Sequence, residues 1–154
     1  MSQEEIIVSQ FCQEFPLLGE NIRIARPRRI FVLVNYGDFA RLFDFAVKQA
    51  ELNSLCAITG LDEGENLAVM YHLAHKNGVV VSIKTVVPKN EPVLKSTINY
   101  FPSAEVYERE LVDLFGFRVE GLPPGSRYPL TDDWPNEEHP LRKDWHPKTE
   151  TPHA

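Results

Sequence analysis

The sequence is poor in features that mark membrane-spanning, metal-binding or nucleic-acid-binding proteins. Its two cysteines, Cys12 and Cys56, are 44 positions apart and form no CxxC pair, so they predict small buried side chains and not an iron–sulfur or zinc site. No stretch offers the roughly 18–20 apolar residues that span a bilayer. The net charge of −6 argues against a nucleic-acid partner. Residues 1–5 lack the basic segment of a signal peptide, so we expect a cytoplasmic location.

Catalytic motifs are also missing. The sequence contains no GxSxG, HExxH, phosphate-binding loop or GxGxxG pattern. His72 and His75 form an HxxH spacing, but on a predicted strand this spacing places the two rings on opposite faces. The residues therefore indicate no catalytic residue and no metal site in this chain.

Hydrophobic periodicity predicts one α+β domain within the 154 residues. We expect helices over 4–15 and 37–52, the second with Asp38 as its N-cap. The strands predicted are 21–25, 30–34, 54–61, 67–74 and 79–87, with a hairpin at Asn77-Gly78. One face of the sheet is expected to meet helices, and the other is expected to be partly solvated.

The helix predicted over residues 107–116 has a double character. Tyr107, Leu111, Leu114 and Phe115 form one apolar stripe, and charged side chains occupy the rest of its surface. Ser103 is the expected N-cap, and Gly116 is expected to end the helix in a left-handed conformation.

The charged residues on this helix leave alternative functions open. Glu108, Glu110 and Asp113 could serve as acid–base carboxylates of a stand-alone enzyme, with Arg142 and Lys143 as neutralising partners. Asp113 is also spaced to pair with Arg109 on the helix surface. A third alternative is an anion-binding module built from three arginines of the first hairpin, namely Arg26, Arg28 and Arg29.

The last part of the chain combines proline with aromatic residues. Residues 117–154 contain seven of the twelve prolines, which prevents regular structure over much of the segment. They also contain Trp134 and Trp145, which a disordered tail would usually lack. We therefore divide the chain into an α+β domain, residues 1–119, and an extended docking arm, residues 120–154.

Two motifs, taken together, resemble a known family. They are Glu108-Arg109-Glu110-x-x-Asp113-Leu114-Phe115-Gly116 in the helix and His139-Pro140-Leu141-Arg142-Lys143-Asp144 in the arm, with Asp132-Asp133-Trp134 between them. At this separation they are similar to the thirty-kilodalton subunit, or C subunit, of respiratory complex I. The same module occurs in membrane-bound group 4 nickel–iron hydrogenases and in formate hydrogenlyase-type complexes. The resemblance covers roughly residues 20–146.

The resemblance implies a two-layer α+β fold with a mainly antiparallel sheet, element order α-β-β-α-β-β-β-α, and a proline-rich arm. It implies that the chain binds no cofactor and catalyses nothing alone. Iron–sulfur clusters, and a nickel–iron site where present, would belong to partner subunits. The chain would pack beside the large subunit, which houses the nickel–iron or quinone site, and near the cluster-bearing small subunit. It would be a peripheral subunit on the cytoplasmic face of the membrane.

The resemblance also assigns a partner interface. It comprises Glu108, Arg109, Glu110, Asp113, Arg127, Asp132, Asp133, Trp134, His139, Pro140, Arg142, Lys143, Asp144 and Trp145. The sequence departs from the family after the helix, where Leu122 replaces an expected histidine and Arg127 alone remains of an arginine pair. The acidic stretch 132–138 resembles the hydrogenase branch more than the quinone-reducing branch.

Overall fold

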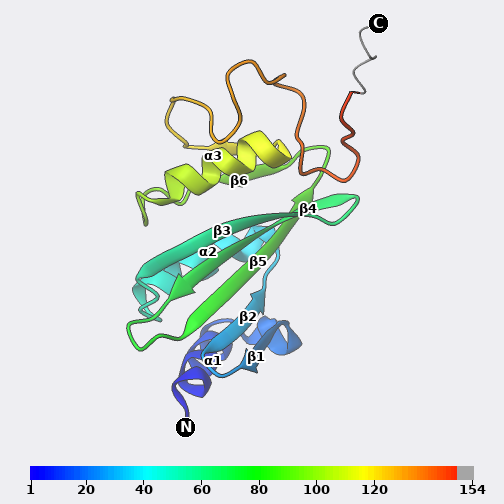
Figure 1. The fold of residues 1–154 in the computed structure, drawn as a ribbon. Coiled ribbons are helices and arrows are strands. Elements are labelled where there is room, and N and C mark those ends of the chain that lie inside the picture. Colours follow the sequence, from blue (N-terminus) through cyan, green and yellow to red (C-terminus); the bar gives the residue numbers. More distant parts are fainter. Residues whose placement is uncertain (149–154) are drawn as a thin grey trace, which may run out of the picture.

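A five-stranded sheet organises the chain in the computed structural model, which describes residues 1–148 (Figure 1). Residues 149–154 of the predicted arm lie outside the described residues. The strand order is β1-β2-β5-β4-β3, and all neighbours are antiparallel except β2 and β5. In chain order the elements are α1 (Gln3–Glu14), the 3-10 helix η1 (Pro16–Asn21), β1 (Ile22–Arg26), β2 (Arg29–Leu33), α2 (Tyr36–Lys48), β3 (Ser54–Asp62), β4 (Asn66–Ala74), β5 (Val80–Pro88), β6 (Val93–Lys95), α3 (Ala104–Phe115) and β7 (Arg118–Glu120).

The predicted α+β class and mainly antiparallel sheet are confirmed. The long elements follow the predicted succession, and three short elements, η1, β6 and β7, are added to it. Strands β6 and β7 form a separate two-stranded parallel sheet, in which Val93 lies opposite Arg118. Each of these strands has three residues, which is too short for an alternating pattern to be recognised.

The beginning of α2 differs from the prediction. The helix begins at Tyr36 and ends at Lys48, short of the predicted end at residue 52. Asn35, and not Asp38, occupies the N-cap position, because Asn35 is the last residue with extended backbone (φ −63°, ψ 143°). Asp38 instead lies in the first turn, where its negative charge still suits the positive end of the helix dipole.

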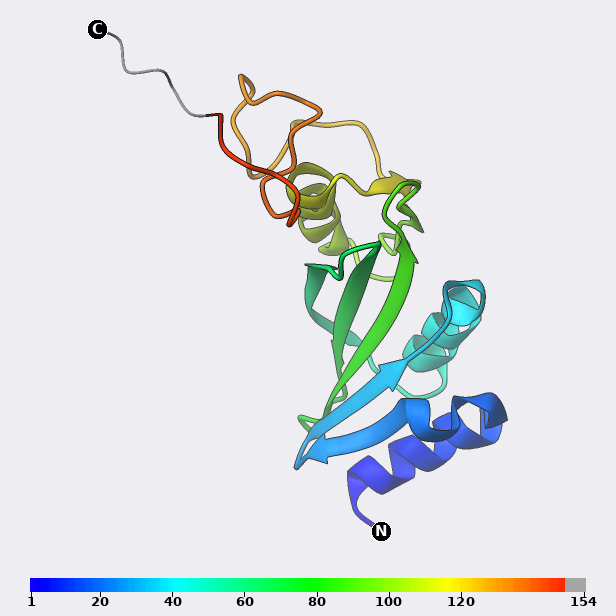
Figure 2. The ribbon, with the colours of Figure 1, turned by 90° about the vertical axis from the view of Figure 1, so that its right-hand side faces the viewer.

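The helices cover one face of the sheet. Alternate residues of β2, β4 and β5 point to this face and form the core with the apolar sides of α1 and α2. Figure 1 shows α2 behind the sheet, and Figure 2 shows α1 and α2 on the same side of it. The fully buried residues Tyr71 and Ile83 lie opposite each other on β4 and β5 and belong to this core.

Helix α3 packs directly on the backbone of β3. A Cβ atom at Gly60 would lie 2.6 Å from a ring carbon of Phe115 and 2.8 Å from Leu111 Cδ2, so only glycine fits there. Leu111 and Phe115 are buried, and Tyr107 and Leu114 pack partly against the core, which confirms the predicted apolar stripe. Gly116 ends the helix with φ +73°, as predicted.

Candidate functional site

The arm folds back over the C-terminal half of α3 (Figures 1 and 2). His139 Nδ1 donates to the carbonyl oxygen of Asp113 at 2.9 Å, the Leu141 N–H donates to that of Leu114 at 3.0 Å, and Arg142 Nε donates to that of Phe115 at 2.6 Å. The last carbonyls of a helix have no partner within the helix. The arm supplies three of these partners, and the Arg142 charge suits the negative end of the helix dipole.

Gly116 also allows this close approach of the arm. A Cβ atom at this position would lie 2.6 Å from His139 Nε2, which is closer than real Cβ atoms approach. The sequence predicted Gly116 only as a helix end. Its second role depends on a residue 23 positions later and has no local signal.

Asp113 fixes the first part of the arm. Arg127 Nε lies 3.3 and 3.4 Å from the two carboxylate oxygens, and the Leu130 N–H donates to Oδ2 at 3.1 Å. Only 6% of the Asp113 side chain and 17% of the Arg127 side chain are exposed. Arg127 Nη1 also donates to the Trp134 carbonyl oxygen at 2.7 Å. One buried ion pair therefore sets the path of residues 127–134 over the helix.

Asp62, at the end of β3, fixes the second part of the arm. Its Oδ2 accepts from the Lys143 N–H at 2.7 Å and from Lys89 Nζ at 2.8 Å, and its Oδ1 accepts from the Gly64 N–H at 2.8 Å. Burial alone would raise the pKa of Asp62, but these donors outweigh it and lower the pKa to about 2. Lys89 Nζ also lies 3.0 Å from Asp144 Oδ1.

The sequence did not single out Asp62. Its surroundings, Asp62-Glu63-Gly64-Glu65, have the composition of a solvated turn. The arm residue that binds it is 81 positions away.

The two tryptophans of the arm lie together. The ring centroids of Trp134 and Trp145 are 5.8 Å apart. Trp134 Nε1 donates to the Glu138 carbonyl oxygen at 2.8 Å, and Trp145 Nε1 donates to Glu138 Oε2 at 3.2 Å. Both side chains are partly exposed, so the pair presents an apolar surface on the outside of the arm.

Glu108 is held inside the domain. Its Oε1 accepts from the Thr97 N–H at 2.7 Å and the Thr97 hydroxyl at 3.0 Å, and its Oε2 accepts from the Ser96 hydroxyl at 2.6 Å. The residue is only 1% exposed. The carboxylate therefore ties α3 to the segment that follows β6.

The predicted pairing of Arg109 with Asp113 is wrong. Arg109 Nη2 instead binds Glu105 Oε1 at 2.7 Å and the Pro123 carbonyl oxygen at 2.7 Å, because the Asp113 carboxylate is taken by Arg127. The predicted neutralising residues also act differently. Arg142 caps helix carbonyls, and Lys143 contributes its backbone N–H to Asp62.

The remaining residues of the predicted interface lie at the surface of the arm and helix. Asp132, Asp133, Lys143 and Asp144 are exposed, and Glu110 and Pro140 are partly exposed. Hydrogen bonding from Thr131 and the charge of Arg127 help to lower the pKa of Asp133. The predicted interface therefore combines exposed and buried side chains, all of which belong to α3 or the arm.

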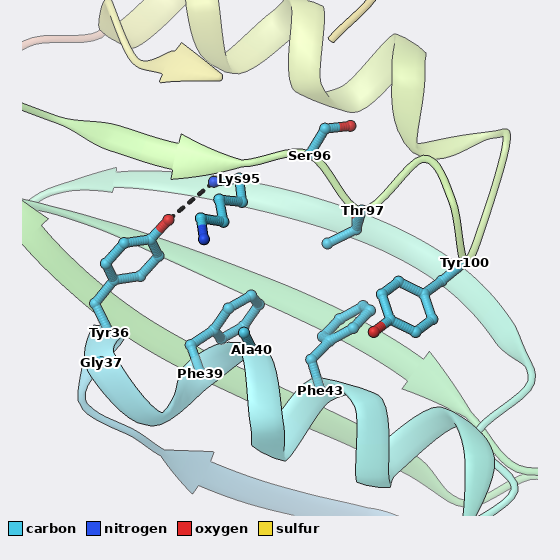
Figure 3. Close-up of a pocket in the computed structure, with 9 residues that line it drawn as sticks. All are labelled: Tyr36, Gly37, Phe39, Ala40, Phe43, Lys95, Ser96, Thr97 and Tyr100. Carbon is cyan, nitrogen blue, oxygen red and sulfur yellow. Dashed lines mark hydrogen bonds between the residues drawn. The ribbon is translucent and has the colours of Figure 1, made fainter. Parts of the chain in front are cut away.

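A cavity between α2 and residues 95–100 was not predicted (Figure 3). Tyr36, Phe39, Phe43 and Tyr100 line it with aromatic rings, and the Lys95 N–H donates to the Tyr36 hydroxyl at 2.9 Å. Burial raises the pKa of Tyr36. Within the described residues, its lining contains no carboxylate or histidine, so the cavity offers no acid–base pair.

The stand-alone enzyme is not favoured by this geometry. Glu108 and Asp113 are each saturated by donors of the same chain, and they face different segments. Among residues 1–148, no group of three or more histidine, cysteine, aspartate or glutamate residues could hold a metal ion. No helix in this described part is long and apolar enough to cross a membrane.

Comparison with known proteins adds independent evidence. The family model described as respiratory-chain NADH dehydrogenase, 30 Kd subunit, matches residues 32–151. The C subunit of the F420H2 dehydrogenase of Methanosarcina mazei is 28% identical over 90% of this chain and 89% of that protein. The combined C/D subunit of the NADH-quinone oxidoreductase of Phocaeicola vulgatus is 40% identical over 61% of this chain, which spans only 18% of that longer protein.

A solved structure has the same fold over nearly the whole chain. It comes from the membrane-bound sulfane sulfur reductase, an archaeal respiratory membrane complex, with a TM-score of 0.77 and 26% identity. The match covers 94% of this chain and 86% of that one. Since the family model matches well over half of the sequence, the chain belongs to the family of the respiratory-chain NADH dehydrogenase 30 kDa subunit.

Proposed function

We propose that this chain is a non-catalytic subunit of a membrane-associated redox complex, and that its arm docks on the large subunit of that complex. The observation that carries the proposal is the arm itself. Residues 127–145 are held on α3 and β3 through Asp113 and Asp62, yet their tryptophan pair remains partly exposed and most of their acidic side chains are exposed. A pre-ordered loop loses little conformational entropy when it binds, so it suits a permanent interface between subunits.

The buried and exposed members of the interface have different roles in this proposal. Asp113, Arg127, His139 and Arg142 shape the arm through contacts within the chain. Trp134 and Trp145, with the exposed carboxylates around them, provide the surface that meets the partner. Large aromatic side chains at the centre of an interface commonly dominate its binding energy.

The identity of the partner is supported by a relative. The Phocaeicola vulgatus protein is named as a combined C/D subunit, and this chain spans only 18% of it. Its name indicates that a C part and a D part share one polypeptide, which keeps them adjacent. We therefore infer that the large subunit, the counterpart of the D part, is the neighbour of the arm, with a cluster-bearing small subunit nearby.

The remaining assignments follow from membership in such a complex. Iron–sulfur clusters, and a nickel–iron site if the complex is a hydrogenase, belong to the partner subunits. The chain is peripheral and lies on the cytoplasmic face of the membrane. The acidic stretch 132–138 favours the hydrogenase branch over the quinone-reducing branch.

The test is co-purification from the native cell. A tagged chain is expected to retain the large subunit after gentle solubilisation, and the W134A/W145A double variant is expected to retain much less. Truncation of a central aromatic residue typically costs about 2–4 kcal/mol of binding. Leu17→Ala is the matched control, because Leu17 is 95% exposed and lies in η1, outside the arm.

The outcomes separate the alternatives. Equal retention of the large subunit by the double variant and the wild type would contradict docking through the arm. A complex that evolves hydrogen would identify the hydrogenase branch, and one that reduces quinone would identify the other. A tagged chain that purifies alone would refute the proposed function.

A further inference from the structure

The face of the sheet opposite α2 is open. Among the described residues, no helix crosses the sheet face that is turned to the viewer in Figure 1, and Figure 2 shows both N-terminal helices on the other side. Strand register identifies the side chains on the open face, because residues directly opposite each other share a face. Phe31 lies opposite Ser82, Met70 opposite Lys84, and Val86 opposite Ala68.

The centre of this face is suited to burial. Phe31, Met70 and Val86 are only partly exposed and give it an apolar character. The polar residues among them satisfy one another: His72 Nδ1 lies 2.8 Å from the Ser82 hydroxyl, and His72 Nε2 lies 3.2 Å from the Thr59 hydroxyl. Polar groups that are already hydrogen-bonded cost little when a partner removes water from them.

The charges on this face have one sign. Although the chain carries a net charge of −6, the charged side chains at the open-face positions of the five-stranded sheet are all basic: Arg23, Arg26, Arg29 and Lys84. Lys84 pairs with Glu63 from the turn between β3 and β4, whereas Arg23 lies over the Phe31 ring with its guanidinium carbon 5.5 Å from the centroid. The exposed Arg28 follows in the hairpin turn between β1 and β2.

We propose that this open face binds an acidic, partly apolar surface of a neighbouring protein subunit, independently of the arm. The inference rests on the proposed function, since it requires that the chain works within a complex. Complementary charge selects an acidic partner, and arginine is the cation most enriched at protein interfaces. The apolar side chains lie on a flat sheet and not on a projecting loop or helix. They therefore match a solid protein surface better than the interior of a bilayer.

Oxidative footprinting tests the inference directly. The sequence contains two methionines, Met1 and Met70, and only Met70 lies on the open face. Hydroxyl radicals convert accessible methionine to its sulfoxide, which mass spectrometry quantifies. Met70 is expected to oxidise several-fold more slowly in the purified complex than in the isolated full-length chain, with the rate at Met1 reporting the radical dose.

A charge variant tests the nature of the partner. In R23E/R29E, Met70 is expected to become exposed at about 0.15 M salt while the large subunit stays bound, because like charges then face each other. In the wild-type complex, raising the salt to about 1 M, which shortens the Debye length from about 8 Å to about 3 Å, is expected to increase the oxidation of Met70 in the same direction. R118E is the matched control, because Arg118 is 67% exposed and lies on β7, outside the open face. A photo-crosslinker at Phe31 in the wild-type complex is expected to capture an acidic stretch of another subunit.

Each contrary outcome has a separate meaning. An intact complex in which Met70 reacts as fast as in the isolated chain would overturn this inference and leave the proposed function standing. Protection of Met70 that disappears when lipid is removed would assign the face to the membrane, and crosslinking to a second copy of this chain would assign it to self-association. Both of these results overturn the proposal. A chain that purifies without other subunits would overturn the proposed function as well.

Discussion

Asp62 is expected to make the stability of this protein depend on pH. Its pKa is lowered from 3.8 to about 2 in the folded chain. A shift of nearly two units, at about 1.4 kcal/mol per unit, corresponds to about 2.5 kcal/mol of folding free energy. Because the folded-state pKa is depressed, this contribution is complete above about pH 5 and is lost as the pH falls towards 2. It is a substantial share of the roughly 5–15 kcal/mol that stabilises a typical domain.

The substitution that isolates this contribution is Asp62→Asn. The amide keeps the shape of the side chain, but its single oxygen can accept from only one of the two backbone N–H groups, Lys143 or Gly64, and it cannot form the ion pair with Lys89. At pH 7 the variant is expected to be about 2–3 kcal/mol less stable than the wild type. Towards pH 2 the two proteins are expected to become equally stable, since the wild-type carboxyl is then protonated too.

Urea denaturation of the full chain between pH 7 and pH 2.5 measures this difference. Asp132→Asn is the control, because Asp132 is exposed and its replacement is expected to leave the stability curve nearly unchanged. A difference between wild type and Asp62→Asn that stays constant over the whole pH range would refute the reasoning. So would equal stabilities at pH 7.

Three further predictions concern α3 and its surroundings. Arg127→Leu leaves a buried carboxylate without its ion-pair partner, so we expect the free energy of unfolding, measured by heat or urea, to fall by about 2–4 kcal/mol. A decrease no larger than that of the exposed control Arg118→Leu would contradict this prediction. Gly60→Ala is expected to lower the free energy of unfolding by about 1–3 kcal/mol through overpacking, and adding Phe115→Leu is expected to recover part of this loss. If the effects of the two substitutions on the free energy of unfolding simply add, the result would argue against the contact. Glu108→Gln is expected to cost about 1–3 kcal/mol by replacing an acceptor oxygen with a donor, and unchanged unfolding would show that its three hydrogen bonds contribute little.

The long elements could be predicted because their patterns are local. The apolar stripe of α3, the left-handed Gly116 and the Asn77-Gly78 turn between β4 and β5 each depend on residues within a few positions. The N-cap of α2 was misassigned because Asn35 and Asp38 are both suitable residue types, and only the backbone conformation distinguishes them.

The function of the charged residues could be predicted only in part. The motifs identified the family, but the pattern alone could not show that Glu108 and Asp113 are buried. Their donors come from Ser96 and Thr97 on one side and from Arg127 on the other, at separations of 11–14 residues. Asp62 was missed altogether, because its importance arises from long-range contacts and not from its neighbours in sequence.

The capping of α3 by the arm has a consequence for synthesis. The helix ends at Phe115, but its last carbonyls receive their donors from residues 26–27 positions further along the chain. At about 5–20 residues per second, the ribosome adds those residues roughly 1–5 s later. During that interval the upstream sheet can fold while the end of α3 still frays. The arm surface that we propose for docking, which includes Trp145, therefore forms only after residue 145 has been made.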